Sequence, residues 1–356
     1  MRRIDIDQIK QQIHVLLVSW GMTQERAQHT AEIMSDADLA GIDSHGISMI
    51  PGYFHLVESG ELAVAVTPEI IAETAATVVL DGGHALGHVT TAEAMKIAID
   101  RASESGLAAV AVRRSRHFGA AGFYAAMAAE AGLIGMVLST TRTRAVTPTR
   151  GTRPLLGTNP LAFASPSSGD PFVLDMSTST VAVNKLKVYE YEHRPLPDGW
   201  VVDGQGNDVT DSNWAYCAVR GEEDGGLTPL GRTESQSSHK GYGLGVMVQI
   251  LAGALTGTAF GRSRSDAEDD GVGHFCLAIS PEFFGDQRLF ESSVSQILDT
   301  LRSEPSLNPD QPVLVAGDKE RSLRAARRSE GVPLSQKLCV QIAEVCEKSG
   351  TQFLLT

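Results

Sequence analysis

Residues 41–50 read GIDSHGISMI and place an acid, a hydroxyl and an imidazole next to one another, as Asp43, Ser44 and His45. An imidazole with an ordinary pKa of about 6.5 can accept or release a proton near neutral pH. The segment follows a helical pattern that Gly41 can end in the left-handed conformation. Two interpretations are therefore open: a polar turn after a helix, or a bend that directs His45 at a substrate.

Three further polar clusters lie next to predicted strands. Residues 115–119 read SRHFG and precede a predicted helix, where backbone N–H groups and an imidazole can bind a phosphate. Residues 156–160 read LGTNP, whose Thr and Asn side chains can orient a polar ligand. Residues 175–178 read DMST and are followed by Lys185. Strand ends are preferred ligand sites in α/β proteins, so the clusters together favour a binding site, although each alone is also typical of a turn.

Two other kinds of active site fit the sequence poorly. In a serine hydrolase the nucleophile and base face each other, whereas Ser44 and His45 are neighbours, and no G-x-S-x-G elbow occurs. The H-x-x-x-H pair formed by His84 and His88 lacks the Glu of H-E-x-x-H. Its glycines predict a loop rather than the helix that would align both rings on zinc. We expect no metal site.

The chain has 356 residues, of which 42% are hydrophobic, so we expect two domains or one large one. The net charge of -13 argues against nucleic acid and anionic membranes as main partners. Residues 241–260 are long enough to span a membrane but contain five glycines and Gln249, so a buried helix packed through small residues is expected. Acids and glutamines replace the apolar core of a signal peptide near the N-terminus, and we expect a cytoplasmic protein.

Basic residues and cysteines give weaker signals. Seven arginines between positions 113 and 153 form either a solvated face or a phosphate-binding site: Arg113, Arg114, Arg116, Arg142, Arg144, Arg150 and Arg153. The four cysteines show no CxxC or metal-ligand spacing and predict buried free thiols: Cys217, Cys276, Cys339 and Cys346.

Hydrophobic periodicity predicts an α/β layer structure, because strand and helix patterns alternate through the middle of the chain. Helices are predicted at residues 6–20, 23–40, 53–61, 91–105, 122–131, 240–255, 293–303 and 335–348. Strands are predicted at residues 77–81, 107–112, 134–139, 160–164, 172–175 and 274–279, and a loop or hairpin at 195–212. No G-x-G-x-x-G follows a strand, so a Rossmann fold is not predicted.

Seven motifs occur in a fixed order along the chain: GIDSHGIS, SRHFGAAGFY, RPLLGTNPLAFA, LDMSTSTVA-x-x-K, LPDGW-x-x-D-x-x-G, SHKGYGLG and GVGHFCLAI. Together they resemble the malate/L-lactate dehydrogenase family, a non-Rossmann group that also includes ureidoglycolate, sulfolactate and diketogulonate enzymes and cyclic-imine reductases. The resemblance extends from about Ile6 to the AGD of residues 316–318. The missing dinucleotide fingerprint agrees with it, because this family binds nicotinamide with its own fold.

The resemblance implies a mixed α/β fold of the sulfolactate/malate dehydrogenase type with helical N- and C-terminal regions. We expect residues 1–72 and 300–356 to form a mainly helical substrate and dimerisation region, and residues 73–299 a cofactor-binding α/β domain. NAD or NADP is the implied cofactor. The family is dimeric, so a homodimer with the site near the subunit interface is expected.

The family also implies residue roles. The His of the SHG motif, here His45, is the proton donor and acceptor while a hydride moves between substrate carbon and nicotinamide. Ser44 would orient its ring, and Lys185 would polarise the substrate oxygen or tune His45. Thr158 and Asn159 match the substrate-side turn. The implied cofactor contacts are His117, Phe118, Gly119, Thr140, Asp175, Met176, Ser177, His239, Lys240, Gly317 and Asp318.

The chain departs from the family at several positions. Many relatives carry a carboxylate-binding arginine four residues after the catalytic His, where this chain has Met49. Arg142 or Arg150 can supply that charge, or the substrate presents another group. Other departures are Thr140, Thr149, Asn184 and Gln249, where relatives commonly have Asn, Trp, Gly and Glu. They concern substrate identity rather than the fold.

Three functions are therefore considered. The first is an NAD(P)-dependent dehydrogenase that transfers a hydride between nicotinamide and a small 2-hydroxy acid/2-oxo acid pair of the malate, lactate or ureidoglycolate kind. The second is a cyclic imino acid reductase of the same family. The third is a non-catalytic nucleotide-binding protein, against which the pair of titratable groups His45 and Lys185 argues, because binding alone does not need them.

Overall fold

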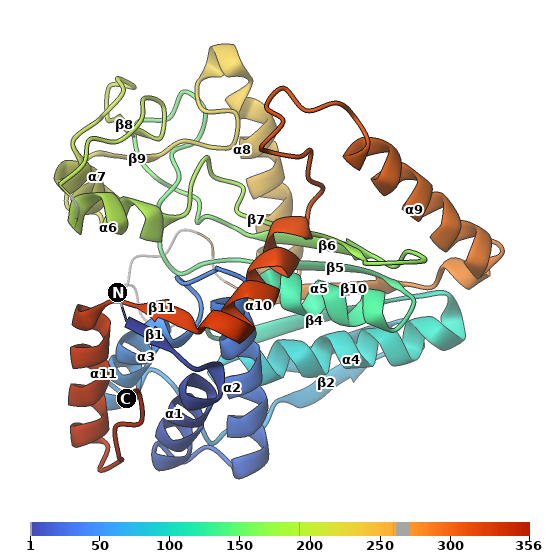
Figure 1. Ribbon diagram of the computed structural model, residues 1–356, viewed down its shortest axis with the longest axis horizontal. Helices are drawn as coiled ribbons and strands as arrows, with labels where there is room; N and C mark the ends of the chain where they lie inside the picture. Colours follow the sequence, from blue (N-terminus) through green and yellow to red (C-terminus); the bar gives the residue numbers. More distant parts are fainter. Residues whose placement is uncertain (1, 192, 259, 261–270) are drawn as a thin grey trace.

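The computed structural model describes residues 2–191, 193–258, 260 and 271–356. A seven-stranded sheet lies at its centre in the order β2-β3-β4-β10-β5-β6-β7 (Figure 1). Its strands are β2 (Glu69–Glu73), β3 (Thr77–Asp81), β4 (Leu107–Ser115), β5 (Ile134–Ser139), β6 (Leu161–Ser165), β7 (Phe172–Met176) and β10 (Val272–Ile279). β3 and β4 run parallel, and every other neighbouring pair is antiparallel. The mixed α/β prediction is confirmed.

Two helices, α4 (Gly87–Ser105) and α5 (Ala121–Glu130), cover one face of this sheet. Side chains alternate between the faces of a strand, so every second residue of the central strands is buried against these helices. Cys276 of β10, for example, lies between Val110 and Val137 and is fully buried. The packing of α4 and α5 on the sheet fixes the position of the loops that lead into these helices.

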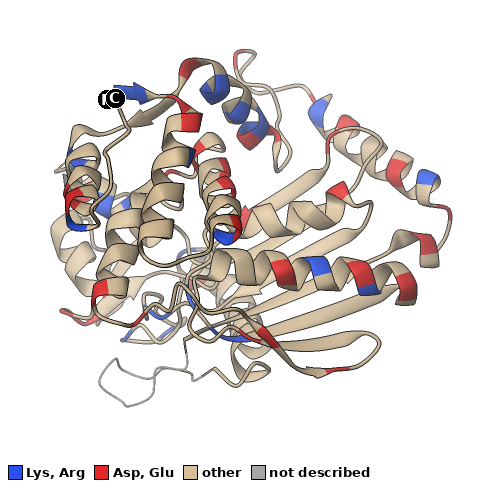
Figure 2. Ribbon diagram, turned by 90° about the horizontal axis from the view of Figure 1, so that it is seen from below, with Lys and Arg blue, Asp and Glu red and all other residues tan. Residues whose placement is uncertain are grey.

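The second face of the sheet is only partly covered. Helix α8 (Ser238–Val248) continues into a π-helical turn, η3 (Gln249–Ala254), which buries Leu138 and Phe275. Other apolar residues of that face keep part of their surface exposed: Leu107, Ala109, Met136, Leu161, Phe163 and Leu277. Figure 2 shows charged residues mainly on helices and loops, and β5, β6 and β10 contain none. An apolar surface of the sheet, without charged residues over β5, β6 and β10, therefore remains accessible.

The N-terminal helices and the C-terminal segment share a second core (Figure 1). It packs α1 (Ile6–Ser19), α2 (Gln24–Leu39), α3 (Ile50–Glu58) and α11 (Gln336–Lys348). A two-stranded sheet of β1 (Arg2–Ile4) and β11 (Val332–Leu334) joins the two ends of the chain. The proposed division into residues 1–72 with 300–356 and residues 73–299 stays a prediction.

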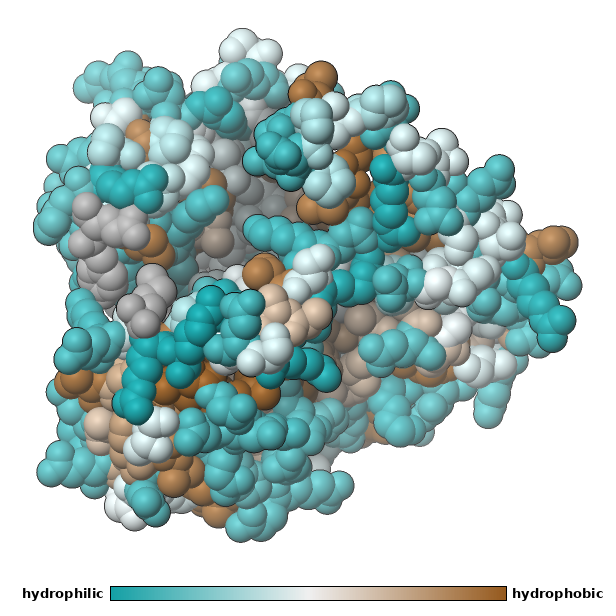
Figure 3. Space-filling model, in the orientation of Figure 1, coloured by the Kyte–Doolittle hydropathy of each residue, from teal (hydrophilic) through white to brown (hydrophobic). Residues whose placement is uncertain are grey.

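A third core lies around α6 (Val183–Tyr191), α7 (Ser212–Ala218) and the paired strands β8 (Val201–Asp203) and β9 (Gly225–Leu227). Figure 3 shows the surface hollowed between this part and the rest of the molecule. The remaining long helices are α9 (Gln287–Arg302), which is largely exposed, and α10 (Asp318–Glu330), which packs on α2. No helix among the described residues is both long and apolar enough to cross a membrane.

Sequence periodicity found most helices and central strands, with shifts at their ends. Helix α4 begins at Gly87 rather than Thr91, so the prediction of a loop at His88 is wrong. The glycines that indicated the loop instead allow close packing, since a methyl group at Gly87 would lie 2.4 Å from the Arg116 carbonyl oxygen. α6, α7 and α10 were not predicted. Residues 195–212 contain β8, which pairs with the distant β9.

Two expectations about burial were only partly right. Residues 241–258 form α8, η3 and a turn, but Ile250 and Leu255 are more than half exposed, so this segment is not a fully buried helix; residue 259 lies outside the described residues. The four cysteines are free, with Cys276 and Cys346 buried and Cys217 and Cys339 partly accessible.

Gly135 tests the packing of α5 on β5. A methyl group there would lie 2.5 Å from the Ala125 carbonyl oxygen, so Gly135→Ala should lower the free energy of unfolding by about 1–3 kcal/mol. Gly169→Ala is the control, because a methyl group at Gly169 meets no atom within 4 Å, and it should change stability by less than about 0.5 kcal/mol. Urea unfolding measures both variants, and equal stabilities would contradict this packing.

Candidate active site

The segment around His45 is a bend that links α2 to α3. Gly41 ends α2 in the left-handed conformation at φ 80°, and Ile42 N–H donates to the Ala37 carbonyl oxygen over 2.9 Å. His45 N–H then donates to the Ile42 oxygen at the same distance. A short 3-10 turn, η1 (Ile47–Met49), leads directly into α3. The predicted bend is confirmed, and His45 lies at its tip.

Ser44 and His45 are in direct contact in this bend. Ser44 Oγ lies 2.7 Å from His45 Nδ1, which fixes the ring orientation and leaves Nε2 as the nitrogen able to meet a ligand. The Ser44 carbonyl oxygen accepts a hydrogen bond of 3.3 Å from Asn184 Nδ2 at the start of α6. Asn184 therefore joins the third core of the molecule to the bend, a contact that the sequence did not predict.

His117 stacks on His45, with ring centroids 5.3 Å apart and an interplanar angle of 27°. The Gly119 N–H points at His117 Nδ1 over 3.3 Å, and Tyr53 Oη lies 2.6 Å from the same nitrogen. Because a backbone N–H can only donate, Nδ1 is an acceptor and the ring proton is on Nε2. His117 thus presents an N–H donor beside the His45 ring.

His88 and Tyr53 complete the cluster, and sequence reasoning missed both. His88 is fully buried in the first turn of α4, with its ring 6.5 Å from His117 and 5.9 Å from Tyr53. Neither of its ring nitrogens has a partner among the described residues. No sequence motif marked Tyr53, and His88 was considered only as a possible zinc ligand. Their spacing from His45 is set by the packing of α3 and α4.

Burial keeps these imidazoles neutral. It lowers the pKa of His45 to about 4, although part of the residue stays accessible. Burial, with a smaller contribution from His45 and His274, lowers the pKa of His88 to about 3. Burial and then the neighbouring histidines lower the pKa of His117 well below its ordinary value. At neutral pH the cluster is therefore uncharged, and His45 is in the form that accepts a proton.

The predicted substrate turn adjoins α8 and η3. Asn159 is buried, and its Nδ2 donates to the Gly245 carbonyl oxygen at 2.9 Å and to Gln249 Oε1 at 3.2 Å. Thr178 holds the turn from the other side, because its N–H and hydroxyl both donate to the Thr158 carbonyl oxygen. Asn159 Oδ1 is buried without a partner among the described residues. Thr158 keeps part of its surface accessible.

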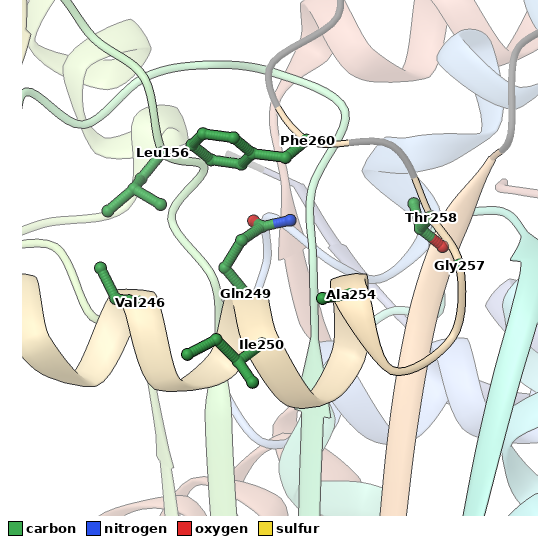
Figure 4. Close-up of a pocket in the computed structure, with 8 residues that line it drawn as sticks. All are labelled: Leu156, Val246, Gln249, Ile250, Ala254, Gly257, Thr258 and Phe260. Carbon is green, nitrogen blue, oxygen red and sulfur yellow. The ribbon is translucent and has the colours of Figure 1, made fainter.

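A pocket of about 510 Å³ opens beside this turn (Figure 4). Its lining is mainly apolar and comprises Leu156, Val246, Gln249, Ile250, Ala254, Gly257, Thr258 and Phe260. In Figure 4 the Gln249 amide lies between Leu156 and Ala254. Gln249 contributes both to this lining and to the hydrogen bond that anchors Asn159.

The segments assigned to the cofactor meet in part at the end of β7. Asp175 Oδ2 accepts a hydrogen bond of 2.8 Å from Gly122 N–H in the first turn of α5, the helix that follows the SRHFG segment. The backbone of Gly317 lies next to Val173, whose N–H donates to the Ala316 oxygen. Three distant segments thus lie together at one edge of the sheet.

Other predicted cofactor residues are held by protein contacts. Phe118 is buried and stacks on His274 with ring centroids 4.7 Å apart, and Thr140 is buried against Gly273 of β10. Ser177 hydrogen-bonds the Ser179 oxygen, and Met176 is partly buried. The first-turn residues of α8, His239 and Lys240, are exposed, and the structure shows no contact that joins them to the other segments.

Asp318 is engaged by arginines at the start of α10. Arg302 Nη2 lies 2.8 Å from Asp318 Oδ1, and Arg321 pairs with the same oxygen. The hydrogen bond from Arg302 is the main reason that the pKa of Asp318 falls to about 2. Asp318 therefore carries a charge that is already neutralised by the protein, and its side chain anchors α10.

The sequence matches a model of the malate/L-lactate dehydrogenase family over residues 4–343. The chain belongs to this family. It is 34% identical to the malate dehydrogenase of Pyrococcus abyssi over 355 residues, which cover 99% of this chain and 96% of that protein. It is 34% identical over 289 residues to the (2R)-3-sulfolactate dehydrogenase (NADP(+)) of Chromohalobacter salexigens, covering 78% and 82% of the two chains.

The solved structure of malate dehydrogenase from Entamoeba histolytica superposes with a TM-score of 0.93 at 32% identity and covers 99% of each chain. The fold is therefore that of the malate and sulfolactate dehydrogenases, as the ordered motifs predicted. The cluster of His45, His117 and His88 lies within this fold.

Two further positions that the family resemblance marked, Met49 and Lys185, can be placed in the structure. Met49, at the position where the resemblance implied an arginine, lies in η1 and packs against the second core. Lys185 is exposed on α6, and its ammonium lies 5.1 Å from the centre of the Trp200 ring. It is one residue from Asn184, which contacts Ser44, but the structure shows no contact between Lys185 and His45.

Most of the arginine cluster is paired with acids. Arg113 and Arg114 contact Asp81, and the other ion pairs are Arg142–Glu61, Arg150–Glu234 and Arg153–Asp224. Among the described residues, no group of three His, Cys, Asp or Glu side chains could hold a metal ion.

The buried cluster should make stability depend on pH. His88 has a pKa of about 3 in the folded protein and an ordinary value of about 6.5 when unfolded. Between these values the unfolded chain binds more protons, so stability is lost as the pH falls below about 6.5. In His88→Gln, the free energy of unfolding should fall less steeply as the pH decreases. Its slope should be smaller than that of the wild type by up to about 1.4 kcal/mol per pH unit, the largest contribution of one titrating group. Urea unfolding between about pH 5 and 7 measures this, and an unchanged slope would contradict it.

Proposed function

We propose that the protein is an NAD(P)-dependent dehydrogenase that interconverts a small 2-hydroxy acid and its 2-oxo acid. The observation that carries this proposal is the neutral His45 ring, held by Ser44 and stacked on His117, at the tip of a bend in the malate/L-lactate dehydrogenase fold. A bound nicotinamide dinucleotide would accept the hydride from C2 of the hydroxy acid or donate it to the oxo acid. The protein must then bind, orient and move one proton.

His45 suits the proton transfer by its charge state. Its pKa of about 4 leaves the ring unprotonated at neutral pH, so Nε2 can accept the hydroxyl proton of a hydroxy acid. A substrate carboxylate close by would favour the imidazolium that forms, because opposite charges attract in a poorly solvated site. His117, which donates through Nε2, can orient an oxygen of the ligand beside the His45 ring.

The proposed place for the dinucleotide is the edge where Asp175, Gly122 and the Gly317 segment meet, because three of the segments assigned to the cofactor come together there. These residues and the SRHFG segment would hold it. The name of the Chromohalobacter enzyme supports testing NADP first, with NAD as the alternative. Lys185 stays a predicted participant, which α6 could bring to the site through Asn184 and Ser44. A cytoplasmic location also stays a prediction.

Arg142 is our proposed ligand for the substrate carboxylate in place of the missing arginine at position 49. Its side chain is 21% exposed and pairs with Glu61 Oε2 at 2.9 Å. The Glu61 carbonyl oxygen in turn accepts from Arg116, the residue directly before His117. Arg150 is the weaker candidate, since its side chain is 78% exposed and pairs with Glu234.

Removal of the His45 imidazole should abolish most of the activity. We expect His45→Gln to lower kcat by about 10²- to 10⁴-fold, because Gln cannot exchange a proton with the substrate. The dissociation constants of NADH and NADPH should change little. Absorbance of the reduced nicotinamide, followed with a panel of 2-oxo acids and cyclic imino acids, gives the measurement.

The control is His55→Gln, which changes an exposed histidine on α3. It should keep wild-type turnover. Turnover with cyclic imino acids alone would favour the reductase of the same family. Silence of the wild-type protein across the panel, despite dinucleotide binding, would favour a non-catalytic binding protein and refute the proposed activity.

We propose that the protein is a homodimer that pairs through the open face of the sheet. The apolar residues of that face are partly exposed, with Leu107 at 45%, and the central strands β5, β6 and β10 add no charge to it. Two copies that each carry a net charge of -13 repel each other, so an uncharged face is the favourable place for contact.

The double variant Leu107→Lys with Met136→Lys tests this interface. The added charges on the two copies would repel each other. In light scattering after gel filtration, the particle mass should therefore fall from that of a dimer to the 37.9 kDa of one chain. Val340→Lys is the matched control, because it places a lysine at an apolar position that is 52% exposed on α11. A double variant that keeps the wild-type mass would show that the sheet face is not the interface.

A further inference from the structure

Asp38 is a buried acid that the proposed chemistry does not use. It lies in the last turn of α2, seven positions before His45, and only 1% of its surface is exposed. An uncompensated carboxyl group in such a place costs several kcal/mol. The partners of the Asp38 carboxyl group therefore indicate what this residue does.

The Asp38 carboxyl contacts the two residues that follow His45. Ile47 N–H donates to Asp38 Oδ2 over 2.8 Å. At Gly46, a methyl group would lie 2.0 Å from Asp38 Oδ1 and 2.1 Å from its Cγ. The carboxyl thus occupies the space of the missing Gly46 side chain. Any movement of Asp38 changes the path of the backbone directly after His45.

Arg327 of α10 holds the same turn from the other side. Its Nη1 donates to the Asp38 carbonyl oxygen over 2.6 Å, and its guanidinium pairs with the Asp43 carboxylate. Asp43 precedes His45 by two residues. The backbone on both sides of His45 is therefore tied to the end of α2, while Ser44 Oγ fixes the ring itself.

The protonation state of Asp38 agrees with a hydrogen-bonding role. Burial raises its pKa to about 8; the Ile47 N–H opposes this rise, Asp43 adds to it, and Arg327 opposes it. Near neutral pH most molecules therefore carry the neutral acid, which accepts from Ile47 through one oxygen. An asparagine has the same shape and can provide the same acceptor.

We propose that Asp38 is a positioning residue that aims the His45 imidazole through its contacts with Ile47 and Gly46. The inference rests on the proposed role of His45 in proton transfer. A general base must lie within hydrogen-bond reach of the proton that it takes, and a displacement of about 1 Å can lower the rate by about 100-fold. Because only 1% of its surface is exposed, Asp38 would act through the bend and not by direct contact with a ligand.

Kinetics of two substitutions test the proposal in the full-length protein. Asp38→Ala should lower kcat by about 10- to 100-fold, with KM and the NADH and NADPH dissociation constants changed less than about two-fold. Asp38→Asn should keep kcat within about three-fold of wild type, because its amide oxygen replaces the acceptor. Gly46→Ala would displace the Asp38 carboxyl group and should lower kcat by a similar factor. This second variant tests the same contact if Asp38→Ala does not fold.

Asp36→Ala is the matched control. Asp36 lies on the same helix and pairs with Arg324 of α10 through contacts of 2.8 and 2.7 Å, but no contact joins it to the bend. Its removal should lower stability and leave kcat unchanged. Equal loss of kcat in Asp36→Ala and Asp38→Ala, or wild-type kcat in Asp38→Ala, would overturn the positioning role.

A second readout does not depend on the reaction. In protein with carbon-13-labelled histidine, the ring signal of His45 is assigned by its loss in His45→Gln. Asp38→Ala and Gly46→Ala should change the chemical shift of this signal and the pH at which it titrates. Asp38→Asn and Asp36→Ala should change neither. If the panel shows no turnover but the signal shifts as expected, the proposed function fails and the positioning role stands. An unshifted signal in a folded Asp38→Ala protein overturns the positioning role alone.

Discussion

The site depends on the removal of water from around closely spaced imidazoles. The centre of the His117 ring lies 5.3 Å from that of His45 and 6.5 Å from that of His88. At this spacing, positive charges on two of the rings would repel strongly. Burial resolves this conflict, because it disfavours the charged form of each ring. The cluster is stable as a neutral group, and this neutrality gives His45 the capacity to accept a proton at ordinary pH.

Three separate parts of the chain create that environment. The helical core provides the bend and Tyr53, the sheet region provides His88 and His117, and α6 reaches the Ser44 carbonyl oxygen through Asn184. The bend itself is tied to α2 and α10 by hydrogen bonds of Asp38 and Arg327. A site assembled from all these parts can form only when they are packed together, so the geometry of the site depends on the complete fold.

The chain has the fold of its family, and the proposed proton acceptor His45 lies among residues of several elements. Met49 packs against the second core, and Gln249 lines an apolar pocket next to the GTNP turn. The proposed exchange of a hydride and a proton rests on His45, whereas selection of the substrate side chain would rest on other surfaces of this kind.

The sequence by itself determined the family, the bend at His45 and most helices and central strands, because these follow from local periodicity, capping residues and ordered motifs. The Gly41 terminator and the Thr23 cap, for example, act within one turn of α2. Only the tertiary structure decided that His117 stacks on His45, that His88 and Tyr53 join them, and that Asp38 supports the bend. These contacts join residues on different elements, and their pKa values depend on how much water the packed elements exclude, which no local pattern in the sequence records.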